Sequence, residues 1–277
     1  MQVNNILSAR RFGAYFKKHL VDNYRLYLMS LIVLTGLLLF ALLFAIFAEP
    51  SIRTYTDLIP SFLIGLYVAG LIFTSKSFSE LGNKSRGIDY LLLPASHLEK
   101  FLTTLLITTI GFLAVYHVAF FLAVKAGEGI ISLRNGTPLI NDLAYNREAD
   151  GWYINYFIWF VAQAMFLLGT VYFQKYSLVK TVLCFFIFLT GMYLINAIFA
   201  QIFFHKYMKD WKAQFPFIGV NILLPHNMEA HTLQYSMNFV MLELPKRAWK
   251  PLLYFFEYFV PPILWTVAYF KLRDKEI

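Results

Sequence analysis

The chain has 277 residues, of which 59% are hydrophobic and only 14% are charged, and its mean hydropathy is +0.58. A soluble domain carries about 25% charged residues, so this composition excludes an ordinary soluble protein. The net charge of +8 would suit nucleic acid, but the lysines and arginines stand in short flanks of apolar runs, as in membrane proteins. No polar block is long enough to fold separately, so we expect one membrane domain, residues 1–277, that binds no nucleic acid.

Six apolar runs are candidates for transmembrane helices. A hydrocarbon core about 30 Å thick needs roughly 20 residues at a rise of about 1.5 Å each. The runs are Leu28–Ala48, Leu58–Thr74, Phe101–Val124, Trp152–Phe173, Thr181–Phe204 and Leu252–Phe270. The first of these runs is too long and begins too late in the chain to be a cleaved signal peptide. The predicted fold class is therefore all-α, a polytopic membrane protein with six transmembrane helices.

The basic residues predict the orientation of these helices. With the N-terminus inside, 14 of the 24 lysines and arginines lie in the cytoplasmic segments 1–27, 75–100 and 174–180 and in the C-terminal tail. This is the distribution that the positive-inside rule requires. Both termini are expected in the cytoplasm.

The segment before the first run has two interpretations. Residues 10–27 place aromatic and leucine side chains at helical spacing and most charges elsewhere on the helix, which predicts an amphipathic helix in the membrane interface. The alternative is a basic flank that only sets the topology. The apolar positions are Phe12, Tyr15, Phe16, Leu20, Tyr24 and Tyr27.

The cytoplasmic loop 75–100 carries two local signals. Ser96 and Glu99 form a capping box, which predicts the start of the third helix. Ile88, Leu91 and Leu92 can share one face of a short helix between Gly87 and Pro94, and such an exposed apolar face normally docks onto a partner. The alternative is that these side chains dip into the lipid headgroups.

The outer segments are predicted from turn residues and prolines. Asn135-Gly136 within 131–139 indicates a small hairpin. In the outer loop 205–251, the stretches Phe215–Leu224 and Tyr235–Leu244 are too short to span, which suits re-entrant or interfacial helices. Pro261 and Pro262 are expected to kink or break the last span.

No pattern for catalysis or nucleotide binding is present. The chain lacks HExxH, GxSxG, a paired-Asp motif and the GxxxxGK[ST] loop. The single cysteine, Cys184, excludes disulfides within the chain and cysteine metal sites, so neither a metal nor a cofactor is expected in this chain. We expect that the protein is not an enzyme.

Four of the polar residues within the apolar runs need a functional or structural explanation. His117 and Glu257 are ionisable, and such groups in lipid often bind substrates. Each has a simpler alternative: a histidine bonded to a neighbouring helix, and a glutamate that reaches the headgroups. Gln163 and Asn196 are interpreted as interhelical hydrogen bonds.

The segment Arg86-Gly87-Ile88-Asp89-Tyr90-Leu91-Leu92-Leu93-Pro94-Ala95-Ser96 resembles a segment of the permease subunits of type-2 ABC exporters. In that family a pattern like R-x-x-G-T-x-E-x-L-L-x-x-P-x-S lies between the second and third spans and introduces the helix that contacts the ATPase. This chain departs from the pattern at Ile88 and Asp89 and in the tighter spacing from Arg86 to Gly87. The amphipathic entry helix, six spans and long outer loop are also similar to that class.

The resemblance implies a permease subunit in the bacterial inner membrane. Such a subunit forms a homo- or heterodimer and pairs with a cytoplasmic ATPase subunit. The implied coupling residues are Arg86, Gly87, Ile88, Asp89, Leu91, Leu92 and Pro94. The alternatives are a secondary transporter, which needs an inverted repeat and buried acids, an intramembrane enzyme, and a scaffold or sensor subunit without an ATPase partner.

Overall fold

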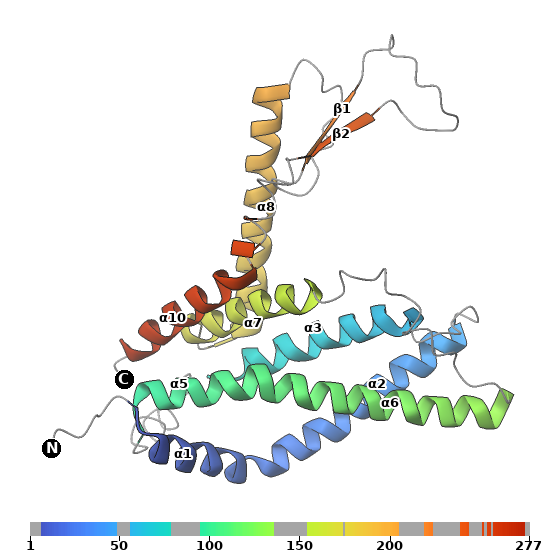
Figure 1. Cartoon of the computed structure of the whole chain (residues 1–277), viewed down its shortest axis with the longest axis vertical. Helices are drawn as coiled ribbons and strands as arrows, with labels where there is room; N and C mark the ends of the chain where they lie inside the picture. Colours follow the sequence, from blue (N-terminus) through green and yellow to red (C-terminus); the bar gives the residue numbers. More distant parts are fainter. Residues whose placement is uncertain are drawn as a thin grey trace. The chain divides into compact units, whose positions relative to one another are not determined.

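The computed structural model describes residues 7–48, 56–78, 95–135, 154–173, 175–204, 219–223, 239–243, 251, 254–255 and 257–274. Most of these residues are helical (Figure 1). Among them, four helices are long and apolar enough to cross a membrane: Tyr24–Phe44, His97–Ile130, Ile154–Tyr172 and Ser177–Phe199. The chain therefore has the helices of a multi-pass membrane protein.

Internal contacts divide the chain into two compact units, each described by itself. The first unit is Met1–Leu178 with Val260–Ile277, and the second is Val179–Phe259. The elements of the first unit are α1 (Ala9–Asp22), α2 (Tyr24–Ala48), η1 (Thr56–Leu58), α3 (Ile59–Ser75), α5 (His97–Leu106), the π-helical turn η3 (Ile107–Gly111), α6 (Phe112–Asn135), α7 (Ile154–Tyr172) and α10 (Val260–Arg273). α8 (Ser177–Phe204) begins in the first unit and continues into the second, which also contains β1 (Gly219–Leu223) and β2 (Phe239–Glu243).

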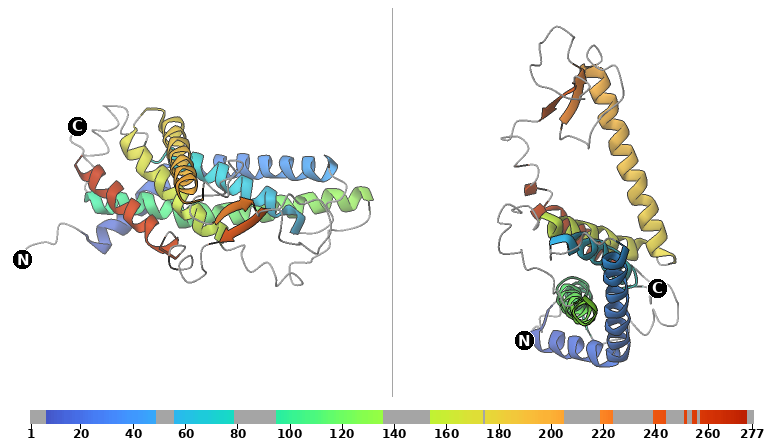
Figure 2. Two further views of the ribbon diagram at one scale, coloured as in Figure 1. Left: turned by 90° about the horizontal axis from the view of Figure 1, so that it is seen from above. Right: turned by 90° about the vertical axis from the view of Figure 1, so that its right-hand side faces the viewer.

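The entry segment forms two helices that meet at Asn23. α1 ends at Asp22 because Asn23 leaves the helical conformation, and both its backbone N–H and its side-chain amide donate to the carbonyl of His19. Figures 1 and 2 show α1 and α2 meeting at an angle there. The helix predicted over 10–27 is therefore present, but its last residues belong to α2.

The third predicted span belongs to a helix that is longer than expected. It runs without interruption from His97 to Asn135 through α5, η3 and α6. The 34 residues from His97 to Ile130 extend about 50 Å, well beyond a core of about 30 Å. The hairpin predicted over 131–139 is wrong for its described residues, since 131–135 are helical. A helix that has already formed extends at little cost, and this outweighs the turn signal of Asn135-Gly136.

The predicted re-entrant or interfacial helices are wrong where the structure describes them. Within Phe215–Leu224 and Tyr235–Leu244, the described residues are the strands β1 and β2, which pair antiparallel from Gly219 opposite Glu243 to Leu223 opposite Phe239. Both strands contain β-branched residues, which favour strands over helices. The structure is therefore mostly helical rather than all-α.

The expected break of the last run lies directly before Pro261 and Pro262. They lie in the first turn of α10, where a missing N–H removes no intrahelical bond. The interruption is a turn at Phe259, and α10, which begins at Val260, has only 14 residues. α10 packs against α7 and the start of α5.

Glycines on α3 allow close packing in the interior of the first unit. A Cβ on Gly70 would lie 2.7 Å from Nε1 of Trp159 and 2.9 Å from the Phe112 ring, and a Cβ on Gly65 would collide with the Tyr116 hydroxyl. Small residues at helix contacts are typical of membrane proteins, because lipid provides no hydrophobic force between helices. A cluster of buried side chains surrounds this contact: Leu38, Leu42, Leu58, Leu66, Phe112, Tyr116, Ala119, Ala123, Val124 and Trp159.

Gly70→Ala is expected to destabilise the protein by about 1–3 kcal/mol, because the new methyl group overpacks the contact with Trp159 and Phe112. The matched control is Gly36→Ala on α2, where a Cβ meets nothing within 4 Å. The measurement is thermal or denaturant unfolding of both variants in detergent. Equal stability of the two variants would contradict this packing.

Candidate functional site

The capping box predicted at the start of the third helix is present and holds more than that helix. The Ser96 hydroxyl accepts a bond from the Glu99 backbone N–H at 3.2 Å, and Glu99 Oε2 accepts one from the Ser96 backbone N–H at 2.9 Å. These bonds use one oxygen of the carboxylate. The other oxygen is available for a distant part of the chain.

Glu99 Oε1 binds the beginning of α1. It accepts a hydrogen bond from the backbone N–H of Ser8 at 2.8 Å. It also accepts bonds from Arg11 Nε and Nη2 at 3.3 and 3.2 Å, which makes an ion pair. The Glu99 side chain is fully buried, whereas that of Arg11 is 35% exposed. We call Ser8, Arg11, Ser96 and Glu99 the Glu99 clamp.

The Glu99 clamp fixes the position of the first turn of α1 against α5. A buried carboxylate is tolerated only with an opposite charge and hydrogen bonds, and both are supplied here from two segments far apart in the sequence. α1 and α5 are in contact along this region. The clamp therefore fixes the residues that directly follow Pro94, where the predicted coupling loop ends.

A packed apolar cluster lies on both sides of that loop. Phe78, the last described residue before it, stacks on Phe101 with ring centroids 6.5 Å apart and planes 8° from parallel. Both rings belong to one cluster with residues of α7 and α10: Leu167, Val171, Ala268 and Leu272. The described residues on either side of 79–94 thus pack into one apolar cluster of the first unit.

A second polar contact joins three elements in the interior. Gln163 on α7 is fully buried, donates to the Thr108 hydroxyl at 3.1 Å and accepts from Trp265 Nε1 on α10 at 3.0 Å. This confirms the interhelical hydrogen bonds predicted for Gln163. Thr108 lies in the π-helical turn η3, a distortion that often marks functional regions. All these groups are satisfied by each other, so the contact joins helices without leaving a free ligand group.

His117 is placed by two hydrogen bonds. Its Nδ1 lies 2.7 Å from the carbonyl oxygen of Leu113 and its Nε2 lies 2.7 Å from the Tyr156 hydroxyl on α7. Because a carbonyl only accepts, Nδ1 carries a proton, and in the neutral ring Nε2 accepts from Tyr156. His117 thus bonds to a neighbouring helix, as its simpler interpretation expects, and its role with a substrate stays a prediction.

The other predicted residues are not brought together. Glu257 lies just before α10 in the second unit, and its Oε1 is buried with no hydrogen-bond partner among the described residues. Asn196 is buried in α8. The coupling residues Arg86, Gly87, Ile88, Asp89, Leu91, Leu92 and Pro94 lie outside the described residues, so their role stays a prediction. Within the described part, no group of three His, Cys, Asp or Glu side chains gathers to hold a metal.

The sequence shows the capping box of the Glu99 clamp but not its pairing with Arg11. A capping box uses one oxygen of its glutamate, so a fully buried glutamate needs another partner. In the sequence, Arg11 is one of several basic residues in the segment 1–27 that predict a cytoplasmic N-terminus. Nothing near it indicates that it pairs with a residue 88 positions later.

The chain matches no family model, no curated protein and no solved structure. Its function is therefore inferred from its own residues and from the resemblance of the segment 86–96.

Arg11→Ala is expected to destabilise the protein by about 1–3 kcal/mol. It leaves the buried Glu99 carboxylate without its opposite charge, and the partial exposure of Arg11 keeps the loss below that of a fully buried pair. Arg10→Ala is the matched control, because the neighbouring Arg10 is exposed and forms no ion pair with any residue that the structure describes; it should change stability by no more than about 0.5 kcal/mol.

The measurements are unfolding in detergent without added phospholipid and hydrogen–deuterium exchange of α1. Exchange in Ala9–Asp22 should rise in the Arg11 variant and stay unchanged in the Arg10 variant. Equal exchange in both would show that the clamp does not hold α1.

Proposed function

We propose that the chain is the permease subunit of an ATP-driven exporter and that it couples to a separate ATPase subunit through residues 86–94. It lies in the bacterial inner membrane with both termini in the cytoplasm, and it pairs with a second permease subunit. In this proposal the chain crosses the membrane six times, with α3 and α10 as the shorter crossings. ATP is bound and hydrolysed by the partner, because this chain has no nucleotide-binding loop.

The observation that carries the proposal is the packing of the described residues on either side of the segment 79–94 into one cluster. Phe78 precedes this segment and stacks on Phe101, which follows it, in a cluster shared with α7 and α10. The Glu99 clamp also attaches α1 to α5, the helix that carries Phe101. In this proposal, a partner that displaces the apolar face of Ile88, Leu91 and Leu92 would also displace the helices that share this cluster.

The length of the third helix supports the same route. It continues as one helix from His97 to Asn135 (Figure 1), so a displacement of its first turn is carried to its other end. Thr108 in η3 is bonded to Gln163 on α7, and Gln163 is bonded to Trp265 on α10. These contacts would spread the movement of one helix to two others.

Leu92→Asp is expected to abolish most ATPase co-purification and ATP-dependent transport. A carboxylate in the proposed apolar contact would cost several kcal/mol if the contact is desolvated. Membrane insertion should survive, because Leu92 lies outside every predicted span. The control Asn83→Ala, outside the apolar face, should change little. If Leu92→Asp retains both properties in a chain shown to bind an ATPase, the coupling contact lies elsewhere.

Single cysteines in a Cys184→Ser background test the proposed orientation. Cysteines at positions 134 and 212 should react with an impermeant thiol reagent from outside, and cysteines at positions 84 and 273 only from inside. The reason is the excess of lysine and arginine in the proposed inner segments. Labelling of position 84 from outside would reverse the orientation and remove the proposed contact from the cytoplasm.

A further inference from the structure

The helix α8 begins without a side-chain cap from any residue that the structure describes. It starts at Ser177, shortly after α7 ends at Tyr172. The first backbone N–H groups of an α-helix have no partner within the helix, and a serine, threonine, aspartate or asparagine before the helix normally caps them. Here the preceding residue is Tyr176, whose side chain is 79% exposed, and the first turn contains no acidic residue. The N–H groups at this end are therefore open to a ligand.

The hydroxyl group of Ser177 is a second unused hydrogen-bonding group at the same end. Ser177 is the first residue of α8 and is only 9% exposed, and its Oγ has no hydrogen-bond partner in the described part of the chain. Buried hydroxyl groups in folded proteins nearly always have a partner. A buried, unpaired hydroxyl group beside uncapped N–H groups indicates a ligand that accepts hydrogen bonds.

The charges around the start of α8 favour an anion. Lys175 is exposed, lies two residues before Ser177 and forms no ion pair with any described residue. Lys271 on α10 has its Nζ 5.3 Å from the ring centroid of Tyr172, so it offsets the partial negative charge of the carbonyl groups at the end of α7. The segment 172–178 contains no acidic residue. The dipole of α8 adds partial positive charge at its first turn.

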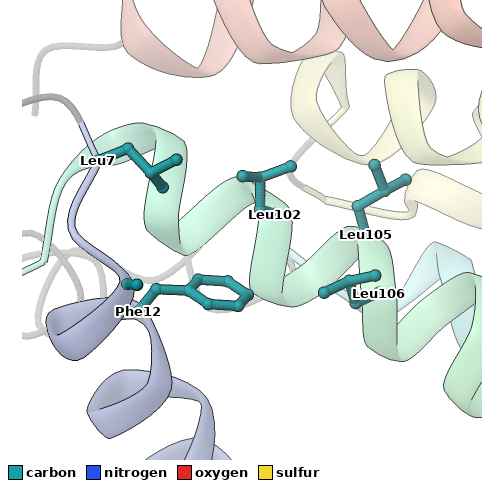
Figure 3. Close-up of a pocket in the computed structure, with 6 residues that line it drawn as sticks. Leu7, Phe12, Leu102, Leu105 and Leu106 are labelled. Atoms are coloured by element: carbon teal, nitrogen blue, oxygen red, sulfur yellow. The ribbon is translucent and has the colours of Figure 1, made fainter.

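The place of this turn in the chain indicates which anion is available. Ile154–Tyr172 and Ser177–Phe199 are both candidate membrane spans, so the turn between them lies at a membrane surface in either orientation. Phosphate groups of phospholipids carry the negative charge at that depth. The groove between α1 and α5 offers nothing to such a ligand, because Leu7, Phe12 and the leucines of α5 line it with hydrocarbon (Figure 3).

We propose that the first turn of α8 binds a phosphate group, with its backbone N–H groups and the Ser177 hydroxyl as donors and Lys175 as the opposite charge. The phosphate belongs either to a phospholipid headgroup or to a free phosphate ion, because both present the same oxygen atoms. The proposal does not depend on the transport function. It requires only that α7 and α8 cross the membrane.

Tyr176→Asp is expected to weaken phosphate binding about tenfold or more. Aspartate at this position would cap the same N–H groups, and its charge would repel a phosphate. Thermal stability without phosphate should not fall, because the helix gains a cap. Tyr176→Phe is the matched control: it removes only an exposed hydroxyl, adds no cap and should bind as wild type does. Lys175→Gln should weaken binding about fivefold, the effect of one basic side chain near an anionic headgroup.

Two measurements on the full chain in detergent distinguish the sources of the phosphate. Native mass spectrometry compares added phosphatidylglycerol with diacylglycerol of the same acyl chains, which has no phosphate, and thermal unfolding is followed with and without inorganic phosphate. Preference for phosphatidylglycerol that is lost in Tyr176→Asp identifies a lipid headgroup, and stabilisation by inorganic phosphate that is lost in the same variant identifies the free ion.

Equal binding of the two lipids, together with no stabilisation by inorganic phosphate, would overturn the proposal. It would also be overturned if wild type binds phosphate but both Tyr176→Asp and Lys175→Gln bind it equally well, because the phosphate would then lie elsewhere. Lys175→Gln changes an exposed side chain and keeps the test valid if Tyr176→Asp fails to fold.

Discussion

The carboxylate of Glu99 is the constraint that organises one end of the first unit. It is fully buried, and its two oxygens bind different segments. Oε2 caps its own helix at Ser96, and Oε1 binds Ser8 and Arg11 at the start of α1. An unpaired carboxylate in this place would be strongly unfavourable, so the two segments must meet. The packing of α1 against α5 depends on this meeting.

The interior of the first unit uses the means that membrane proteins have in place of a hydrophobic driving force. Glycines let α3 approach Trp159 and Tyr116 closely, and hydroxyl groups bond across helices. The Tyr116 hydroxyl donates to the carbonyl of Phe62 at 2.7 Å, and the Tyr67 hydroxyl donates to the carbonyl of Asn155 at 2.8 Å. With Gln163, these bonds link α3, α6, α7 and α10 by directional contacts that a lipid tail cannot replace.

Predictions that rest on local physics agree with the structure. The first, fourth and fifth runs correspond to α2, α7 and α8 within a few residues, because length and hydrophobicity decide insertion without reference to the rest of the chain. The capping box is also local, since its two residues are three positions apart. Predictions from turn residues failed: Asn135 ends a long helix rather than starting a hairpin, and the short stretches around Val220 and Val240 pair as strands.

Three properties could be read from neighbouring residues alone: that this is a multi-pass membrane protein, where most of its helices lie, and that the third is capped by Ser96. The contacts of Glu99 with Arg11, of Gln163 with Thr108 and Trp265, and of Gly70 with Trp159 became visible only in the folded chain. These contacts link residues between 55 and 102 positions apart. Hydrophobic length places each helix in the membrane, but it does not specify which faces meet, and that depends on the close fit of side chains from several helices.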